Sequence, residues 1–132
     1  FDQVGWGEGE IFTHWDIRHK GRIFIRNDSL MNISGEAYDQ FVKPFDQRLF
    51  DTFGGGAVHF CGTGDHFIQS MTSTNGLTMI NASQPHLNHL EVLFDATIDR
   101  GIPLSRFQKS VALEQIERGR DLRGRVQVLD FQ

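Results

Sequence analysis

Several side chains that can bind a metal ion or carry a proton lie within one glycine-rich stretch, GGGAVHFCGTGDHF, at positions 54–67. His59 and Cys61 stand two positions apart at the end of its apolar run. Residues two apart on a β-strand point to the same side of the sheet, and imidazole and thiolate are both zinc ligands. The spacing therefore predicts His59 and Cys61 as metal ligands, with His59 also a catalytic candidate. The alternative is that His59 is a hydrogen-bonded interior residue and Cys61 a small buried apolar one.

Further candidates follow the other apolar runs of the chain. Asp28 comes just after the run RIFIRN, and Asn81 directly follows the run LTMI. Proteins built from parallel strands and helices place their sites at the carboxyl ends of the strands. We therefore predict Asp28 as a catalytic residue and Asn81 as a substrate-binding residue. Gln84 and His66 are two more predicted substrate contacts, with ordinary loop or surface roles as their structural alternative.

The elements that must position these residues alternate in type along the chain. Short apolar runs predict strands, and apolar residues at i, i+3, i+4 and i+7 predict the helices between them. Residues 1–20 show no clean period and predict an irregular lead-in, either a packed loop or a strand remnant. The predicted strands cover 22–27, 57–60, 77–80, 103–107 and 125–131, and the predicted helices cover 34–53, 66–71, 88–101 and 110–116.

Capping signals mark the beginnings of several of these helices. Ser34 is the predicted N-cap of the helix 34–53, and Asp65 and Ser110 are the predicted N-caps of two later helices. Pro44 has no backbone N–H to donate, which predicts a kink within 34–53 or two short helices. The aromatic residues predicted to lie in the core are Phe24, Phe41, Phe45, Phe50, Phe53 and Phe94.

The order of the predicted elements indicates an α/β fold. Short apolar strands that alternate with amphipathic helices are typical of parallel strands covered by helices. Two architectures fit this pattern, an open doubly wound sheet or part of a (β/α)8 barrel. The glycine pattern of dinucleotide-binding folds is missing, because the glycines at 54–56 precede a strand instead of following one.

The composition limits the partners that the chain can have. Its 132 residues are 39% hydrophobic and include 12 Phe, enough for the core of one domain or of a part of one. A net charge of -4 gives no basic footprint, so we expect no nucleic-acid partner. No apolar run is long enough to span a membrane. The single cysteine cannot form an internal disulfide, which predicts a reducing, cytoplasmic setting. Because the chain begins at Phe1 instead of Met, we expect it to be part of a longer protein.

A series of motifs runs in order from about residue 20 onward. A strand ends in Asp, a helix carries a proline near its middle, and a later strand ends in His-x-Cys-Gly. In this order the motifs resemble the uroporphyrinogen decarboxylase superfamily, and the likeness continues through NASQPHLNHLEVL. The residues that carry it are Asp28, Ser34, Tyr38, Phe41, Val42, Pro44, His59, Cys61 and Gly62.

The resemblance implies that residues 1–132 form the carboxyl-terminal part of a (β/α)8 TIM barrel with parallel strands and outer helices. The superfamily includes cobamide-dependent methyltransferases, in which a His-x-Cys pair supplies zinc ligands. His59 and Cys61 match that pair, which implies a zinc-dependent enzyme that activates a thiol for transfer of a corrinoid- or thiol-linked methyl group. The methyltransferase pattern usually adds a later cysteine. None follows Cys61, and Asp130 is the oxygen ligand considered in its place.

Two alternatives remain open at this point. The first is a uroporphyrinogen III decarboxylase of haem and porphyrin biosynthesis, a lyase that acts on a tetrapyrrole and needs no metal or other cofactor. These decarboxylases carry a histidine near the final strand, which RVQVLDF lacks, and their key arginines lie in the amino-terminal half. The second is a non-catalytic half-barrel that associates with itself. Because an open parallel sheet leaves unpaired edges, we expect either a homo-oligomer or pairing with an amino-terminal half of the same chain.

Overall fold

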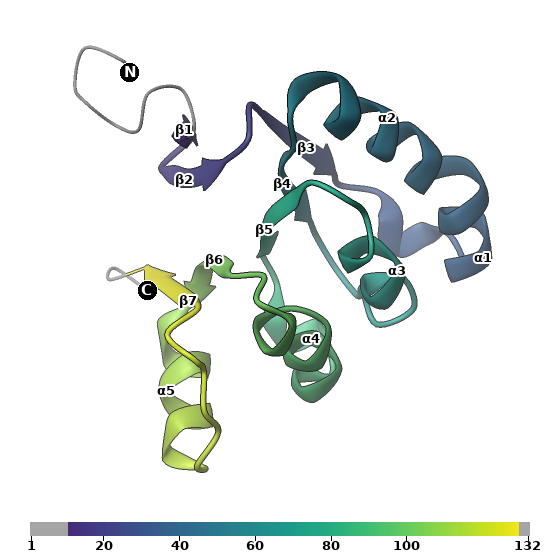
Figure 1. Ribbon diagram of the computed structural model, residues 1–132. Helices are drawn as coiled ribbons and strands as arrows, with labels where there is room; N and C mark the ends of the chain where they lie inside the picture. Colours follow the sequence, from purple (N-terminus) through teal and green to yellow (C-terminus); the bar gives the residue numbers. More distant parts are fainter. Residues whose placement is uncertain (1–10, 130–132) are drawn as a thin grey trace.

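The structure, a computed structural model, describes residues 11–129 and centres on a five-stranded parallel sheet (Figure 1). Strands that follow one another in the chain are also neighbours in the sheet, and every adjacent pair is parallel. The predicted α/β class and its parallel strands are confirmed, although the last residues of the final predicted strand, 130 and 131, lie outside the described residues. The strands are β3 (Ile23–Asn27), β4 (Gly56–Phe60), β5 (Leu77–Ala82), β6 (Leu104–Gln108) and β7 (Val126–Leu129).

Helices connect the strands and cover one face of the sheet (Figure 1). Phe50, Phe94 and Ala112 come from three of these helices and are buried in one core with Phe60 and Phe107 of the sheet. No helix between residues 11 and 129 combines the length and apolar character that a membrane-spanning helix needs. The helices are α1 (Gly35–Ala37), α2 (Lys43–Phe53), α3 (Ile68–Thr72), α4 (Leu90–Ala96) and α5 (Lys109–Glu117), with 3-10 turns at Leu30–Asn32, Pro85–Leu87 and Ile98–Arg100.

A β-hairpin covers part of the opposite face of the sheet. Its strands, β1 (Ile11–His14) and β2 (Ile17–Lys20), pair antiparallel. Ile17 is 1% exposed and packs against Ala57 and Met79 in a second, smaller core. Of the two alternatives predicted for this lead-in, a packed loop or a strand remnant, residues 11–20 form strands, and strands of four residues are too short to show a period. The rest of that segment, residues 1–10, lies outside the described residues.

The predicted helix 34–53 is interrupted, as Pro44 predicts. A π-helical turn, Tyr38–Val42, separates α1 from α2, and Pro44 lies in the first turn of α2, where a missing N–H costs no hydrogen bond. At the beginning, the Ser34 hydroxyl accepts a hydrogen bond from the backbone N–H of Ala37 at 3.0 Å, so the predicted N-cap is confirmed. Gly54 ends α2 in the left-handed conformation, with φ of 81°.

Three of the phenylalanines predicted to lie in the core are exposed. Phe41, Phe45 and Phe53 are 63%, 58% and 45% exposed on the outer side of the interrupted helix. Asp46 takes one of the positions that face the sheet, because the Asn27 side-chain amide donates a hydrogen bond of 2.9 Å to its carboxylate. The remaining predicted core residues are Phe50 and Phe94, which are buried, and Phe24, which is half-buried in the smaller core.

Two predicted N-caps are wrong. The Asp65 carboxylate accepts hydrogen bonds from the backbone N–H of His89, at 3.1 and 3.3 Å, and so serves the residue that precedes α4 instead of the helix that follows Asp65. The last helix begins one residue before Ser110, and Gln108 occupies its N-cap position. In both places a tertiary contact or a strand end, and not the local capping signal, determines where the helix begins.

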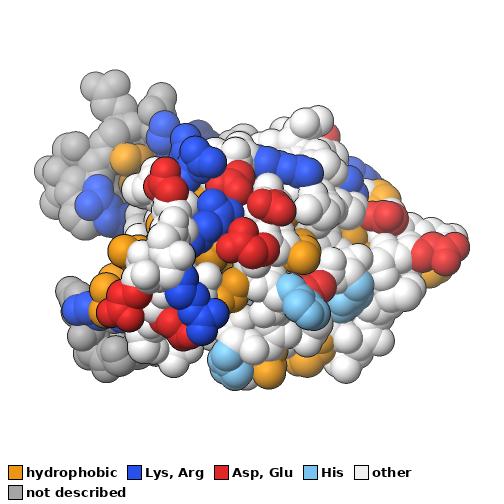
Figure 2. Space-filling model, turned by 90° about the horizontal axis from the view of Figure 1, so that it is seen from below, with side chains coloured by type: hydrophobic (Ala, Val, Ile, Leu, Met, Phe, Trp, Pro, Cys, Tyr) orange, Lys and Arg blue, Asp and Glu red, His pale blue; other side chains and the backbone are white. Residues whose placement is uncertain are grey.

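An ion-pair network joins α4 to the segment that leads into β7. Asp99 pairs with Arg120 and with Arg123, each at 2.8 Å. Arg120 also pairs with Glu91 at 3.2 Å and lies over the ring of Phe94. Figure 2, a view from the side of α4 and α5, shows acidic and basic side chains side by side on this face. The two guanidinium groups lower the pKa of the Asp99 carboxyl well below its ordinary value, chiefly through their hydrogen bonds.

Candidate metal centre

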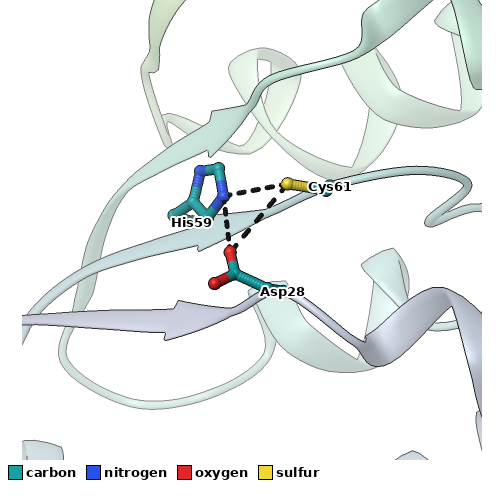
Figure 3. Close-up of side chains that lie close together, drawn as sticks. All are labelled: Asp28, His59 and Cys61. Atoms are coloured by element: carbon teal, nitrogen blue, oxygen red, sulfur yellow. Dashed lines mark hydrogen bonds and ion pairs between the residues drawn. The ribbon is translucent and has the colours of Figure 1, made fainter.

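Three candidate ligands meet at the carboxyl end of the parallel sheet (Figure 3). Asp28 follows β3, His59 lies on β4, and Cys61 follows β4. The His59 Nε2 atom lies 2.9 Å from Asp28 Oδ1 and 3.1 Å from Cys61 Sγ. Cys61 Sγ lies 3.9 Å from the same carboxylate oxygen. One histidine nitrogen, one thiol and one carboxylate thus surround a common space.

The register of the sheet explains why these residues meet. Arg26 of β3 lies opposite His59 of β4, and His59 lies opposite Asn81 of β5. Asp28 is two positions beyond Arg26, and Cys61 two positions beyond His59, so all share one face of the sheet. The chain then turns away at Gly62, whose φ of 73° is left-handed and favours glycine.

A short chain of hydrogen bonds orients the His59 ring. The Asn81 side-chain amide donates to the backbone carbonyl of Ser105 at 2.8 Å, which leaves its carbonyl oxygen facing His59. That oxygen accepts a hydrogen bond of 2.6 Å from Nδ1 of His59. The proton of a neutral His59 therefore resides on Nδ1, and the lone pair of Nε2 points into the pocket. Trp15 packs edge-on against the other side of the ring, with centroids 5.5 Å apart.

This orientation makes the space between the three side chains suitable for a cation. A lone pair on Nε2, a carboxylate oxygen and a sulfur all supply electron density, and all three face one another. Either a proton on Nε2 or a metal ion removes the repulsion among them. Metal-binding histidines typically donate their other ring N–H to a fixed oxygen, as His59 does to Asn81.

The three donor atoms form a set that could hold a metal ion, and they lie within 4.8 Å of one another. Nitrogen, thiolate sulfur and carboxylate oxygen are the ligands that zinc takes in proteins, and tetrahedral zinc separates them by about 3.3–3.7 Å. Two of the observed separations, 2.9 and 3.1 Å, are shorter than that range, and the third, 3.9 Å, is longer. Three protein ligands would leave a fourth position open, as in catalytic zinc sites. Asp28, predicted as a catalytic residue, is thus a candidate for the third ligand. Asp130, considered for that role from the sequence, lies outside the described residues.

The candidate ligands line a pocket of about 400 Å³ that also contains groups unforeseen from the sequence. Its walls include Trp15 from the hairpin turn, Arg26 from β3, Ser83 from the loop after β5, and Arg106 from β6. Arg26 shares the parity of Asp28 and could have been found by counting along the strand. Trp15 and Arg106 gave no such signal, because the first lies in a segment without a period and the second in an irregular strand.

The predicted substrate contacts separate into two groups. Asn81 lines the pocket. Gln84 does not, because its side-chain carbonyl accepts a hydrogen bond from the backbone N–H of Gly62 at 2.9 Å and holds the loop after Cys61. His66 is exposed beside Phe67, outside the residues that line the pocket.

Below the end of β3, a buried carboxyl supports the residue that precedes Asp28. Burial raises the pKa of Asp46, and the hydrogen bond from Asn27 partly offsets that rise. Asn27 is the last residue of β3, so this contact fixes the point from which the chain leads to Asp28.

Comparisons of the chain with family models, with curated proteins and with solved structures found no match.

Proposed function

We propose that the chain is the carboxyl-terminal part of a (β/α)8 barrel of the uroporphyrinogen decarboxylase superfamily. In this proposal the pocket binds zinc through Asp28, His59 and Cys61, and the enzyme transfers a methyl group from a corrinoid or thiol carrier to a substrate thiol. One observation carries the proposal. The lone pair of His59 Nε2, oriented by Asn81, faces a carboxylate and a thiol across a shared space. A reducing, cytoplasmic compartment belongs to the proposal, because Cys61 must remain a thiol to act as a ligand.

The arrangement of the sheet supports the barrel. Its strands lie in chain order, and α2 to α5 pack on one face only. A doubly wound sheet reverses its strand order and carries helices on both faces, whereas a barrel does neither. The candidate site lies at the carboxyl ends of the strands, which is where barrels build their active sites.

The residues of the pocket can perform the steps that thiol activation requires. A bound zinc ion would hold the substrate thiol as its thiolate, the form that attacks a methyl group. Asn81 keeps the His59 ring in the orientation that presents Nε2 to the ion. The side chain of Asp28 is 48% exposed, so water reaches the site and can take up the thiol proton.

Metal analysis of the full-length protein tests this proposal. We expect about one zinc ion per chain, lost in Cys61→Ser and in His59→Gln because each removes a ligand. His66→Gln is the matched control, since it removes an exposed histidine outside the pocket and should leave zinc bound. A metal-free protein that decarboxylates uroporphyrinogen would contradict the proposal and favour a haem-pathway decarboxylase. A protein with neither zinc nor turnover would favour a non-catalytic half-barrel.

A further inference from the structure

Two residues of the pocket have backbone conformations that L-amino acids rarely adopt. Of the described residues other than glycine, Trp15, Arg106 and Arg123 have positive φ, of 54°, 49° and 57°. Trp15 and Arg106 both line the pocket with the candidate ligands. Such conformations persist only where their surroundings hold them, and they concentrate at functional sites.

A bulge in β6 delivers Arg106 to the pocket. Leu104 pairs with Val126 and Phe107 with Val128, so three steps along β6 match two along β7. Both Leu104 and Phe107 are fully buried on the helix-covered face. The left-handed residue between them, Arg106, takes up the extra step and lines the pocket on the opposite face. Bulges beside active sites commonly redirect a side chain in this way.

Among the described residues, the contacts of Arg106 hold one edge of its guanidinium. Its Nε pairs with Asp16 at 3.2 Å, and its Cζ lies 5.9 Å from the centre of a Trp15 ring. Within residues 11–129, the two terminal nitrogens of Arg106 have no hydrogen-bond partner. A guanidinium held at Nε presents these two nitrogens as a fork, which matches the two oxygens of a carboxylate.

A second guanidinium lies against the same indole. The Cζ of Arg26 is 4.8 Å from the centre of the Trp15 ring, and Arg26 pairs with Asp28 at 3.4 Å. When Asp28 and Cys61 neutralise a divalent ion, the Asp28 charge no longer compensates Arg26. The metal-loaded pocket then carries unbalanced positive charge from Arg26, while the charge of Arg106 remains paired with Asp16.

We propose that Arg106, with Arg26 and against Trp15, binds a carboxylate of the substrate, so that the pocket selects a small thiol that carries a carboxylate group. The substrate class rests on the proposed function, because the thiol half of the ligand requires the metal. The carboxylate half rests on Arg106 and the bulge, and Arg26 adds to it only when the metal ion is bound. Arg106 is therefore a specificity-determining residue of the pocket. It lies on the face of the sheet that the helices do not cover.

Calorimetric titration of the zinc-loaded full-length protein tests this inference with two probes of equal size, 3-mercaptopropionate and 3-mercaptopropionamide. We expect the acid to bind about tenfold more tightly than the amide, as a bidentate charged contact would allow. The preference should vanish in Arg106→Gln and persist in part in Arg106→Lys, which keeps the charge and loses the fork. Arg118→Gln, on the exposed surface of α5's end, is the matched control and should keep the full preference. Circular dichroism and zinc content show whether each variant remains folded and loaded.

The outcomes separate the two proposals. Bound zinc with equal affinity for acid and amide overturns the carboxylate site and leaves the proposed function standing. Absence of zinc binding overturns the proposed function. The carboxylate site is then tested without the thiol, by comparing the affinities of propionate and propionamide for the same variants. A preference for propionate that Arg106→Gln abolishes supports the carboxylate site, and equal affinities overturn it.

Discussion

At the scale of single residues, the position of one proton determines what the pocket can bind. Asn81 donates to Ser105 and accepts from His59, and this chain of contacts fixes the tautomer of the ring. A leucine at 81 would remove both contacts while keeping a similar volume. The imidazole could then rotate, and Nε2 would no longer be held toward the shared space.

Asn81→Leu should therefore weaken zinc binding by about 10- to 100-fold, the usual effect of removing the partner of a metal-binding histidine. Asn81→Asp keeps an oxygen acceptor for Nδ1 and should bind zinc more tightly than Asn81→Leu. Competition with a chromophoric chelator measures both affinities. Equal zinc affinity in the wild type and in Asn81→Leu would mean that Asn81 has no role in orienting the ring.

The sequence could predict this part of the site because strand parity and parallel register determine it. His59, Cys61, Asp28 and Asn81 follow from counting along three strands. The position of Arg106 could not be predicted in the same way. Arg106 lines the pocket only because a left-handed residue interrupts the alternation of β6, and no residue type in that strand signals such a break.

At the scale of elements, the interrupted helix shows how a polar contact can override an apolar pattern. The apolar spacing of the sequence predicts that Phe41, Phe45 and Phe53 lie on the inner face. In the structure these side chains are exposed, and Asp46 is buried instead. The π-helical turn at Tyr38–Val42 changes the helical phase before α2 begins, and the hydrogen bond from Asn27 compensates the burial of Asp46. Neither feature is visible in a periodicity that assumes a regular helix.

Asp46→Asn should raise the stability of the protein at pH 7. Because burial raises the folded-state pKa of Asp46 above its ordinary value of 3.8, ionisation costs the folded state stability as pH rises through that raised pKa. Asparagine retains an acceptor for Asn27 without the charge. The urea midpoint of the variant should therefore exceed that of the wild type at pH 7, and the difference should disappear toward pH 3. The exposed Asp51→Asn on the same helix is the control. A variant that is less stable than the wild type at pH 7 would contradict this account.

At the scale of the whole molecule, the fold is a row of strand–helix units in chain order, with a hairpin over one face. The alternation of strands and helices could be predicted because each unit has its own periodicity, and the parallel sheet follows from that alternation. The hairpin could not, since its packing against Ala57 and Met79 depends on contacts far apart in the sequence. The last unit consists of β7 and the segment that leads into it. The pairing of β6 with β7 and the network centred on Asp99 join this unit to the rest of the fold.

The ion pairs of Asp99 with Arg120 and Arg123 indicate how the stability of the last unit changes as pH falls. The hydrogen bonds from Arg120 and Arg123 lower the pKa of Asp99, so its contribution to stability is present above pH 4 and is lost as pH falls through the lowered pKa. Asp99→Asn should remove that contribution at neutral pH. Hydrogen exchange should then quicken at the backbone N–H groups of Leu104 and Arg125, which bond to the Arg125 and Leu122 carbonyls where the last unit joins β6. Glu114→Gln, which breaks the exposed pair with Arg118, should leave these rates unchanged. Equal exchange at Leu104 in the wild type and in Asp99→Asn would show that strand pairing alone holds the last unit in place.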